Sequence, residues 1–225
     1  MEEKQFKYST KALLIPFICV FLCWFVYWIE YYFKTSFNSY GLYPQTIKGL
    51  RGILFSPFIH ADTKHLFNNS VPLFVMIWAL FYFYKKIAYK VLIYGTLLTG
   101  LLTWTFARPS YHIGASGVVY LLVSFLFFSG MFRKYYRLVA LSLAIVFLYG
   151  SMIWYIFPVE DKISWEGHLS GFVIGFIFAF ISRKLGPQPE KYEFTKNEAF
   201  DKLFDEDGNF NPPVEEEITD EVHVN

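Results

Sequence analysis

A serine and a histidine, each surrounded by small residues, are the strongest chemical signal in this sequence. Ser116 lies in the segment 114–117 (Gly-Ala-Ser-Gly), and His168 lies in the segment 167–171 (Gly-His-Leu-Ser-Gly). A serine hydroxyl is a weak nucleophile near neutral pH unless a neighbouring base accepts its proton, and an imidazole is a natural base. Each motif opens a long hydrophobic run, where polar groups mark functional sites by default. The pair therefore predicts acyl-transfer chemistry inside a membrane.

A second polar pair stands at the start of another hydrophobic run. His65 and Asn69 are four residues apart, so on a helix their side chains share one face. Acyl transfer builds negative charge on the carbonyl oxygen, which fixed hydrogen-bond donors stabilise. We expect His65 and Asn69 to be such donors, together with the backbone N–H of Ser116 near the start of its helix. No aspartate is placed to orient His168, so we expect a dyad rather than a triad.

Taken alone, each of these residues also fits a structural role. A lone membrane histidine such as His168 is equally well explained as a structural residue bonded to a carbonyl. Ser116 alone would be a small packing residue, and Asn69 alone an interhelical hydrogen bonder. His112 and His223, in a short loop and in the C-terminal region, gain no role in this interpretation.

The composition indicates a membrane protein. Hydrophobic residues make up 55% of the chain and charged residues 17%, with a mean hydropathy of +0.34. The net charge of +1 gives no support for nucleic-acid binding.

A membrane-spanning helix needs about 20 apolar residues. Six segments qualify: 12–33, 66–84, 89–106, 113–132, 136–157 and 168–185. The first is too long and lacks the small-residue cleavage site of a signal peptide, so we expect it to remain as a helix.

The basic residues predict the orientation, because loops on the cytoplasmic side are enriched in Lys and Arg. One set of connections is rich in them: Lys4, Lys7, Lys11, Lys85, Lys86, Lys90, Arg133, Lys134, Arg137, Arg183 and Lys184. The other set has Arg108 and Lys162 in its short loops and four scattered basic residues in 34–64. We therefore expect a multi-pass protein with both termini cytoplasmic, in the plasma (inner) membrane if the source is bacterial. The second, fourth and sixth helices then begin at the outer face. His65, Ser116 and His168 stand near these starts, so we expect their side chains at the same depth in the membrane.

Glycines predict how two of these helices meet. Gly167, Gly171 and Gly175 recur every four residues, a small-xxx-small pattern that allows close helix approach. The segment around Gly114 is equally small. If these two surfaces pack together, His168 can reach the serine hydroxyl.

In combination, these residues resemble the rhomboid family of intramembrane serine proteases over about residues 56–185. Ser116 resembles the nucleophile of the family's G-x-S-G motif. His168, followed by Gly171 and Gly175, resembles the base on the family's last core helix.

Further matches support the same resemblance. His65 and Asn69 fit the family's H-x-x-x-N pattern, and His60 matches an upstream histidine that we expect to support the loop rather than to perform chemistry. Tyr120 matches the aromatic residue on which the family's histidine stacks. One departure concerns the Trp-Arg pair of many members, since a leucine precedes Arg51 here. We expect this arginine still to hold the first loop.

The resemblance implies an all-α bundle of six transmembrane helices that cleaves transmembrane segments of other membrane proteins. Its expected partners are such substrates and membrane lipid, without nucleic acid, and the sequence gives no signal for an oligomeric state. No cofactor or metal is implied, and the H-E-x-x-H motif of zinc proteases is absent from the sequence. The alternative is a catalytically silent relative that binds membrane clients as a chaperone. Retention of both Ser116 and His168 argues against it.

The sequence divides into three parts. Residues 1–11 form a short N-terminal segment, 12–185 the helical membrane domain and 186–225 a tail. The tail has 12 acidic residues against three lysines, so we expect it to be soluble and largely disordered. Thr195 and Glu198 have the spacing of a capping box for one short helix.

Overall fold

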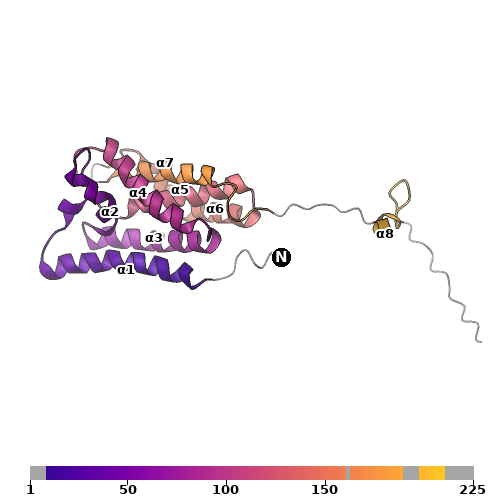
Figure 1. Cartoon of the computed structure of the whole chain (residues 1–225), viewed down its shortest axis with the longest axis horizontal. Coiled ribbons are helices and arrows are strands. Elements are labelled where there is room, and N and C mark those ends of the chain that lie inside the picture. The colour runs from indigo at the N-terminus through magenta and orange to yellow at the C-terminus, as the bar shows by residue number, and fades with distance from the viewer. Residues whose placement is uncertain (1–8, 161–162, 190–197, 211–225) are drawn as a thin grey trace, which may run out of the picture. The chain divides into compact units, whose positions relative to one another are not determined.

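The computed structural model describes residues 9–160, 163–189 and 198–210. The chain forms two units, Met1–Pro189 and Glu190–Asn225. In its described part, the first unit is a bundle of six long helices joined by loops and shorter helices (Figure 1). The long helices are α1 (Thr10–Phe33), α3 (Thr63–Phe83), α4 (Ala88–Phe106), α5 (Ser116–Arg133), α6 (Tyr136–Tyr149) and α7 (Trp165–Ile181). The described residues contain no β-strand, which confirms the all-α prediction.

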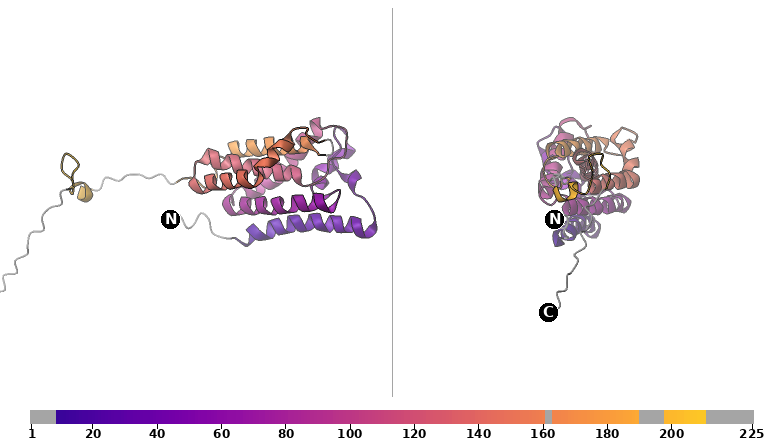
Figure 2. Two further views of the ribbon diagram at one scale, coloured as in Figure 1. Left: turned by 180° about the vertical axis from the view of Figure 1, so that it is seen from behind. Right: turned by 90° about the vertical axis from the view of Figure 1, so that its right-hand side faces the viewer.

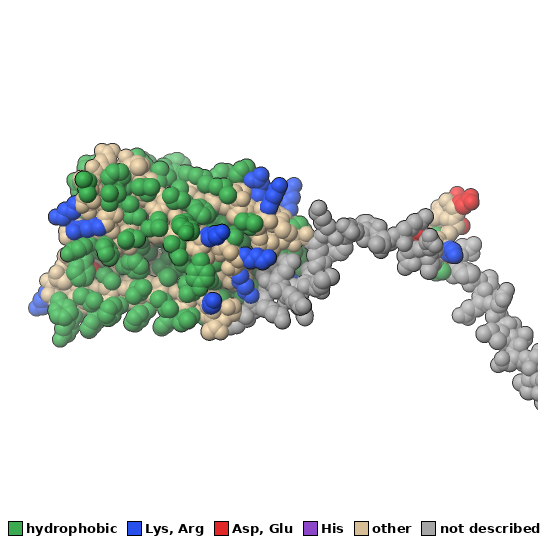
Figure 3. Space-filling model, viewed as in Figure 1, with side chains coloured by type: hydrophobic (Ala, Val, Ile, Leu, Met, Phe, Trp, Pro, Cys, Tyr) green, Lys and Arg blue, Asp and Glu red, His purple; other side chains and the backbone are tan. Residues whose placement is uncertain are grey.

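Four segments of the described chain are long and apolar enough to cross a membrane: Thr10–Phe33, Thr63–Phe83, Ser116–Arg133 and Tyr136–Ile156. The apolar helix α7 is shorter, and α4 is not among the four. Figure 3 shows a predominantly hydrophobic surface over the bundle, with Lys and Arg side chains gathered toward its two ends. A multi-pass architecture is therefore confirmed, while the count of six spans stays a prediction.

Helix α5 is the centre of the bundle and packs against α3, α4, α6 and α7, whereas α1 lies on the outer side against α3 (Figures 1 and 2). The contact with α7 is the closest. A β-carbon on Gly171 would lie 2.2 Å from the carbonyl oxygen of Gly117, and one on Gly175 would lie 2.3 Å from that of Leu121. The two backbones therefore touch, as the small-xxx-small pattern predicts.

Three of the differences from the predicted helix boundaries bear on the site. α5 begins at Ser116 rather than 113, because Gly114 has φ +104°, outside the helical region. α7 begins at Trp165, so His168 lies inside its first turn. The predicted helix 136–157 is wrong in its last part: α6 ends at Tyr149 and the chain continues as the 3₁₀ helix η5 (Gly150–Ile156). The low helix propensity of glycine fits a break at this point.

The loop between α1 and α3 contains four short helices: η2 (Asn38–Tyr40), η3 (Lys48–Arg51), α2 (Gly52–Phe55) and η4 (Ser56–Phe58). Arg51 donates to the carbonyl of Ser39 at 2.7 Å, and its guanidinium lies 4.2 Å from the ring centre of Tyr40. Arg51 thus holds this loop, with a leucine as the preceding residue.

Arg133, the last residue of α5, is buried at the end of the helix opposite Ser116. Arg133 donates to the carbonyls of Ser182 and Leu185 at 2.7 and 2.8 Å and to the hydroxyl of Ser129 at 2.7 Å. Carbonyls at the end of a helix lack partners within it, and a cation there also opposes the helix dipole. Arg133 therefore fixes the end of α7 against α5.

The second unit contains the short helix α8 (Glu198–Asp201) and a turn in which Asp205 accepts hydrogen bonds from the backbone of Asp207 and Asn209. Residues 1–8, 161–162, 190–197 and 211–225 lie outside the described residues. The predicted disorder of most of the tail and the capping residue Thr195 fall among them.

Candidate active site

The structure brings Ser116 and His168 into hydrogen-bond contact. Ser116 is the first residue of α5, His168 is in the first turn of α7, and the Oγ to Nε2 distance is 2.9 Å. The imidazole is buried, with 7% of the residue exposed. The contact depends on the glycine interface, because only a close approach of the two helices brings these side chains together.

The second nitrogen of His168 identifies its tautomer. Nδ1 lies 2.9 Å from the carbonyl oxygen of Tyr155 in η5. A carbonyl only accepts hydrogen bonds, so Nδ1 carries the proton and the lone pair of the neutral ring is on Nε2, facing Ser116. The ring also stacks on Tyr120, with centroids 4.2 Å apart and planes at 11°. The sequence indicated the stacking residue through the family resemblance, but it missed the carbonyl.

The predicted oxyanion donors lie over the loop that leads to Ser116. A β-carbon on Gly114 would lie 2.6 Å from Nε2 of His65 and 3.6 Å from Nδ2 of Asn69. Only glycine fits here, because a side chain would clash with the histidine and positive φ strains other residues. Asn69 is buried and Asn68 is exposed, as the predicted register requires.

His65 is held by the cap of α3. Its backbone N–H donates to the Asp62 carboxylate at 2.8 Å, which caps the helix. The N–H of Ala61 points at Nδ1 of the ring over a long 3.5 Å. That contact leaves the ring proton on Nε2, the atom nearest Gly114, where it can be donated.

His60 connects the first loop with the residue before Ser116. Its Nδ1 lies 3.3 Å from the carbonyl of Phe58, and its Nε2 accepts from the N–H of Ala115 at 3.4 Å. Burial, together with the neighbouring His65, lowers the pKa of His60 to about 4. The ring is therefore neutral, and both of its nitrogens are used structurally.

His112, to which the sequence gave no role, makes a set of structural hydrogen bonds. Its Nδ1 lies 2.6 Å from the Ser164 hydroxyl, and its Nε2 lies 3.1 Å from the Arg108 carbonyl. Its backbone exchanges two hydrogen bonds with Leu42 of the first loop, at 2.8 and 3.0 Å. Burial lowers the pKa of His112. One residue thereby connects three loops, and a lone loop histidine carries no sequence signal for this.

A buried carboxylate connects the same loops beside the dyad. Glu166, 1% exposed, lies 3.4 Å from Nε of Arg108 and accepts from its backbone N–H at 3.3 Å. The same guanidinium donates to the carbonyl of Ile163. The pair ties the loop before Ser116 to the start of α7. A glutamate two residues before His168, at the start of an apolar run, is the signal that could have found it.

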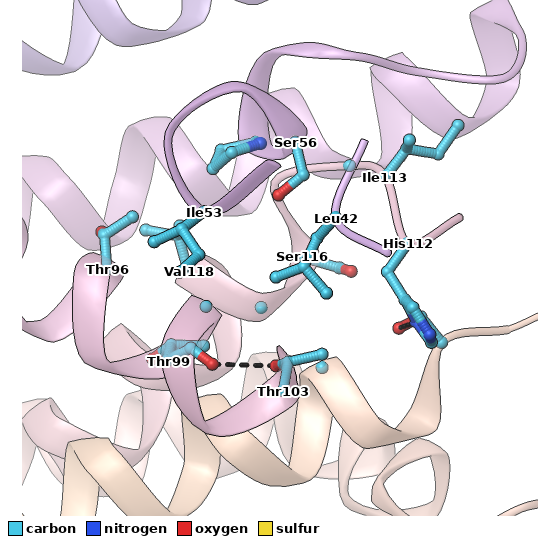
Figure 4. A pocket seen from close by; sticks show the side chains of 16 residues that line it. Leu42, Ile53, Ser56, Thr96, Thr99, Thr103, His112, Ile113, Ser116 and Val118 are labelled. Carbon is cyan, nitrogen blue, oxygen red and sulfur yellow. Dashed lines mark hydrogen bonds between the residues drawn. The ribbon is translucent and has the colours of Figure 1, made fainter. Parts of the chain in front are cut away.

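A small cavity of about 50 Å³ adjoins the nucleophile (Figure 4). Ser116 lines it together with Thr96, Thr99 and Thr103 of α4. Thr103 donates to the carbonyl of Thr99, whereas the Thr99 hydroxyl is buried without a hydrogen-bond partner in the described structure. The cavity has the size and polarity to hold water. Among the described residues, no group of three or more His, Cys, Asp or Glu side chains could hold a metal ion.

Comparison with known proteins agrees with this geometry. The family model described as Rhomboid domain matches residues 48–185. Uncharacterized proteins of Mycobacterium tuberculosis and Mycobacterium bovis are each 32% identical over 152 residues, covering 63% of this chain and 62% of the relative. One from Mycobacterium leprae is 30% identical over 144 residues, covering 59% of this chain and 56% of the relative. The match thus spans less than two thirds of these relatives.

Proposed function

This chain belongs to the rhomboid family, and on that premise we propose that it is an intramembrane serine endopeptidase that cleaves transmembrane segments of other proteins. The family and the apolar helices make it an integral multi-pass membrane protein. The observation that carries the proposal is the 2.9 Å contact between Oγ of Ser116 and Nε2 of His168, with the lone pair of the ring directed at the hydroxyl.

The first half of the reaction acylates the serine. Oγ of Ser116 attacks the scissile carbonyl carbon while its proton passes to Nε2 of His168. The negative charge that develops on the carbonyl oxygen is stabilised by the side chains of His65 and Asn69 and by the N–H of Ser116 at the start of α5. The imidazolium then protonates the leaving nitrogen, and the C–N bond breaks.

The second half hydrolyses the acyl-enzyme. His168, neutral again, takes a proton from water, whose oxygen attacks the ester carbonyl carbon. When the tetrahedral species collapses, the Ser116 oxygen leaves and regains a proton from the imidazolium. The cavity beside the serine, with the free hydroxyl of Thr99 in its wall, is placed to supply that water.

The family resemblance implies the substrate class. An intact transmembrane helix engages its carbonyls in internal hydrogen bonds, so a cleavable segment must unfold locally before Ser116 can attack. We propose substrates with locally unstable helices and a small side chain before the scissile bond, cut near the outer face.

A serine-reactive probe tests the proposal. We expect a fluorophosphonate to label the detergent-solubilised protein, and Ser116→Ala and His168→Ala each to abolish labelling and cleavage of a transmembrane substrate. The double variant should resemble either single one, because the two residues act as a unit. Ser170→Ala is the matched control on α7 and should behave as wild type. A folded wild-type protein that binds membrane clients but is neither labelled nor active would instead support the silent chaperone.

We further propose that both termini are cytoplasmic. A single-cysteine labelling scan, on a background in which Cys19 and Cys23 are replaced, measures this directly. Labels at Lys85 and Arg183 should be accessible from the cytoplasm and a label at Arg108 from outside. The reverse pattern would refute the orientation.

A further inference from the structure

His168, the candidate catalytic histidine, also contacts a segment that belongs to neither α5 nor α7. This segment is an unusual helix. η5 (Gly150–Ile156) continues α6 with 3₁₀ geometry for seven residues, whereas most 3₁₀ helices are only three or four residues long. Of its residues only Ile156 is buried, and Trp154 is 67% exposed. η5 is therefore a long 3₁₀ segment at the end of α6 with little of its surface buried.

Two backbone carbonyls of η5 hold the two rings of the stacked pair. The carbonyl of Tyr155 accepts from Nδ1 of His168 at 2.9 Å, and the carbonyl of Met152 accepts from the hydroxyl of Tyr120 at 2.7 Å. Met152 and Tyr155 are three residues apart, so with 3.0 residues per turn their carbonyls share one side of the helix. The 3₁₀ geometry itself therefore places both acceptors toward the site.

We propose that η5 is the orienting element of the Ser-His pair. The Tyr155 carbonyl fixes His168 as its Nδ1–H tautomer, and the Met152 carbonyl holds Tyr120 beneath the imidazole. Met152, Tyr155 and Tyr120 are thus positioning residues that act through His168. The inference rests on the proposed function, because orientation of the ring matters for catalysis only if His168 is the base.

The arrangement replaces the carboxylate of a triad with a neutral acceptor. In a triad, an aspartate selects the histidine tautomer and holds the ring. Tyr155 provides the same selection through a neutral carbonyl, so no charged group has to be buried against Nδ1 of the ring, where an unpaired charge is costly. Because η5 buries few side chains, it can detach from α5 and α7 and return in a local equilibrium. The Ser-His pair is active only while η5 contacts both rings.

Tyr120→Phe is the test, because it removes one link to η5 and keeps the aromatic ring under His168. We expect the rate of fluorophosphonate labelling at Ser116 to fall about 3- to 10-fold, the range for loss of one neutral hydrogen bond. With a transmembrane substrate, kcat should fall while KM stays unchanged. Tyr149→Phe, at the end of α6, is the matched control and should label as wild type.

A backbone substitution tests the second link. Replacing Ile156 with its α-hydroxy analogue turns the 155–156 amide into an ester and weakens the Tyr155 carbonyl as an acceptor. The same exchange at Trp154 is the matched control. We expect the first ester to slow labelling and the second to leave it near the wild-type rate. Equal effects of the two esters would overturn the proposal.

Histidine ¹⁵N NMR separates this inference from the proposed function. The wild-type His168 signal, assigned by its loss in His168→Gln, should show the Nδ1–H tautomer, and Tyr120→Phe should introduce the other tautomer. If the fluorophosphonate does not label the wild type, the protease proposal fails. The NMR signal still shows whether Nδ1 of His168 donates to the Tyr155 carbonyl of η5. An Nε2–H tautomer in the wild type, or identical signals and labelling rates in Tyr120→Phe, would overturn the role of η5.

Discussion

Replacement of Gly171 by alanine should inactivate the protein while leaving it in the membrane. The added β-carbon would lie 2.2 Å from the Gly117 carbonyl oxygen and 2.9 Å from the Leu121 backbone nitrogen. Both contacts are with backbone of α5, which cannot rotate away as a side chain can. A carbon–oxygen contact needs about 3.3 Å. The helices α5 and α7 must therefore separate by about 1 Å at this level.

The dyad lies at the same interface, so the separation acts on it directly. Ser116 and His168 are 2.9 Å apart, and a further 1 Å or so would exceed the range of a hydrogen bond. A misplacement of about 1 Å can cost ~10²-fold in rate. We expect cleavage and fluorophosphonate labelling to fall about 100-fold, with a loss of about 1–3 kcal/mol in stability from overpacking.

Gly95→Ala is the matched control, because Gly95 of α4 also faces α5. There the added β-carbon would meet only the side chain of Leu121, at 2.7 and 3.0 Å, and that side chain can adjust. Labelling rates and thermal unfolding of the two variants would be measured in the same detergent. A wild-type rate for Gly171→Ala, or an equal loss for Gly95→Ala, would refute the argument that backbone contact sets the distance within the dyad.

Three further predictions follow from the site and the opposite end of the bundle. Replacing His65 or Asn69 by alanine should lower substrate turnover by about 10² while Asn68→Ala stays close to wild type, and equal losses at the two asparagines would disprove the register. Thermal stability should fall as the pH is lowered from about 6.5, because the folded-state pKa of His60 is about 4 and the unfolded chain therefore binds the proton more readily in that range. His60→Gln should have a shallower pH dependence of its melting temperature, and an unchanged slope would contradict the assignment. Arg133→Lys should lower the free energy of unfolding by about 1–3 kcal/mol, since a lysine cannot reproduce the forked hydrogen bonds to the end of α7, and an unchanged unfolding curve would show that these bonds do not stabilise the bundle.

Much of the architecture was predictable because its determinants are local in the sequence. A membrane-spanning helix needs one continuous apolar segment, so composition alone indicated a helical membrane protein. The four-residue spacing of Gly171 and Gly175 likewise identified a face for close packing, and the structure places both glycines against the backbone of α5. The motifs around Ser116 and His168 indicated the family that the comparison then confirmed.

Helix ends were less predictable, because they depend on contacts with other parts of the chain. The segment 136–157 is predominantly apolar on both sides of Gly150, and this glycine alone does not predict that a 3₁₀ helix follows α6. The position of η5 against α5 and α7 depends on contacts between residues that are far apart in the sequence. The role of His112 is tertiary in the same sense, since its partners Ser164 and Leu42 are 52 and 70 residues away in the sequence.

The apolar helices, the glycine face and the residue types that can perform acyl transfer are local features that can be read along the chain. The groups that orient those residues follow from the fold. The acceptor for His168 is the carbonyl of Tyr155, and the acceptor for Tyr120 is that of Met152. Every residue has a backbone carbonyl, so no side-chain pattern distinguishes these two from the others. The path of the chain selects them, because it alone determines which carbonyls lie within hydrogen-bond distance of the two rings.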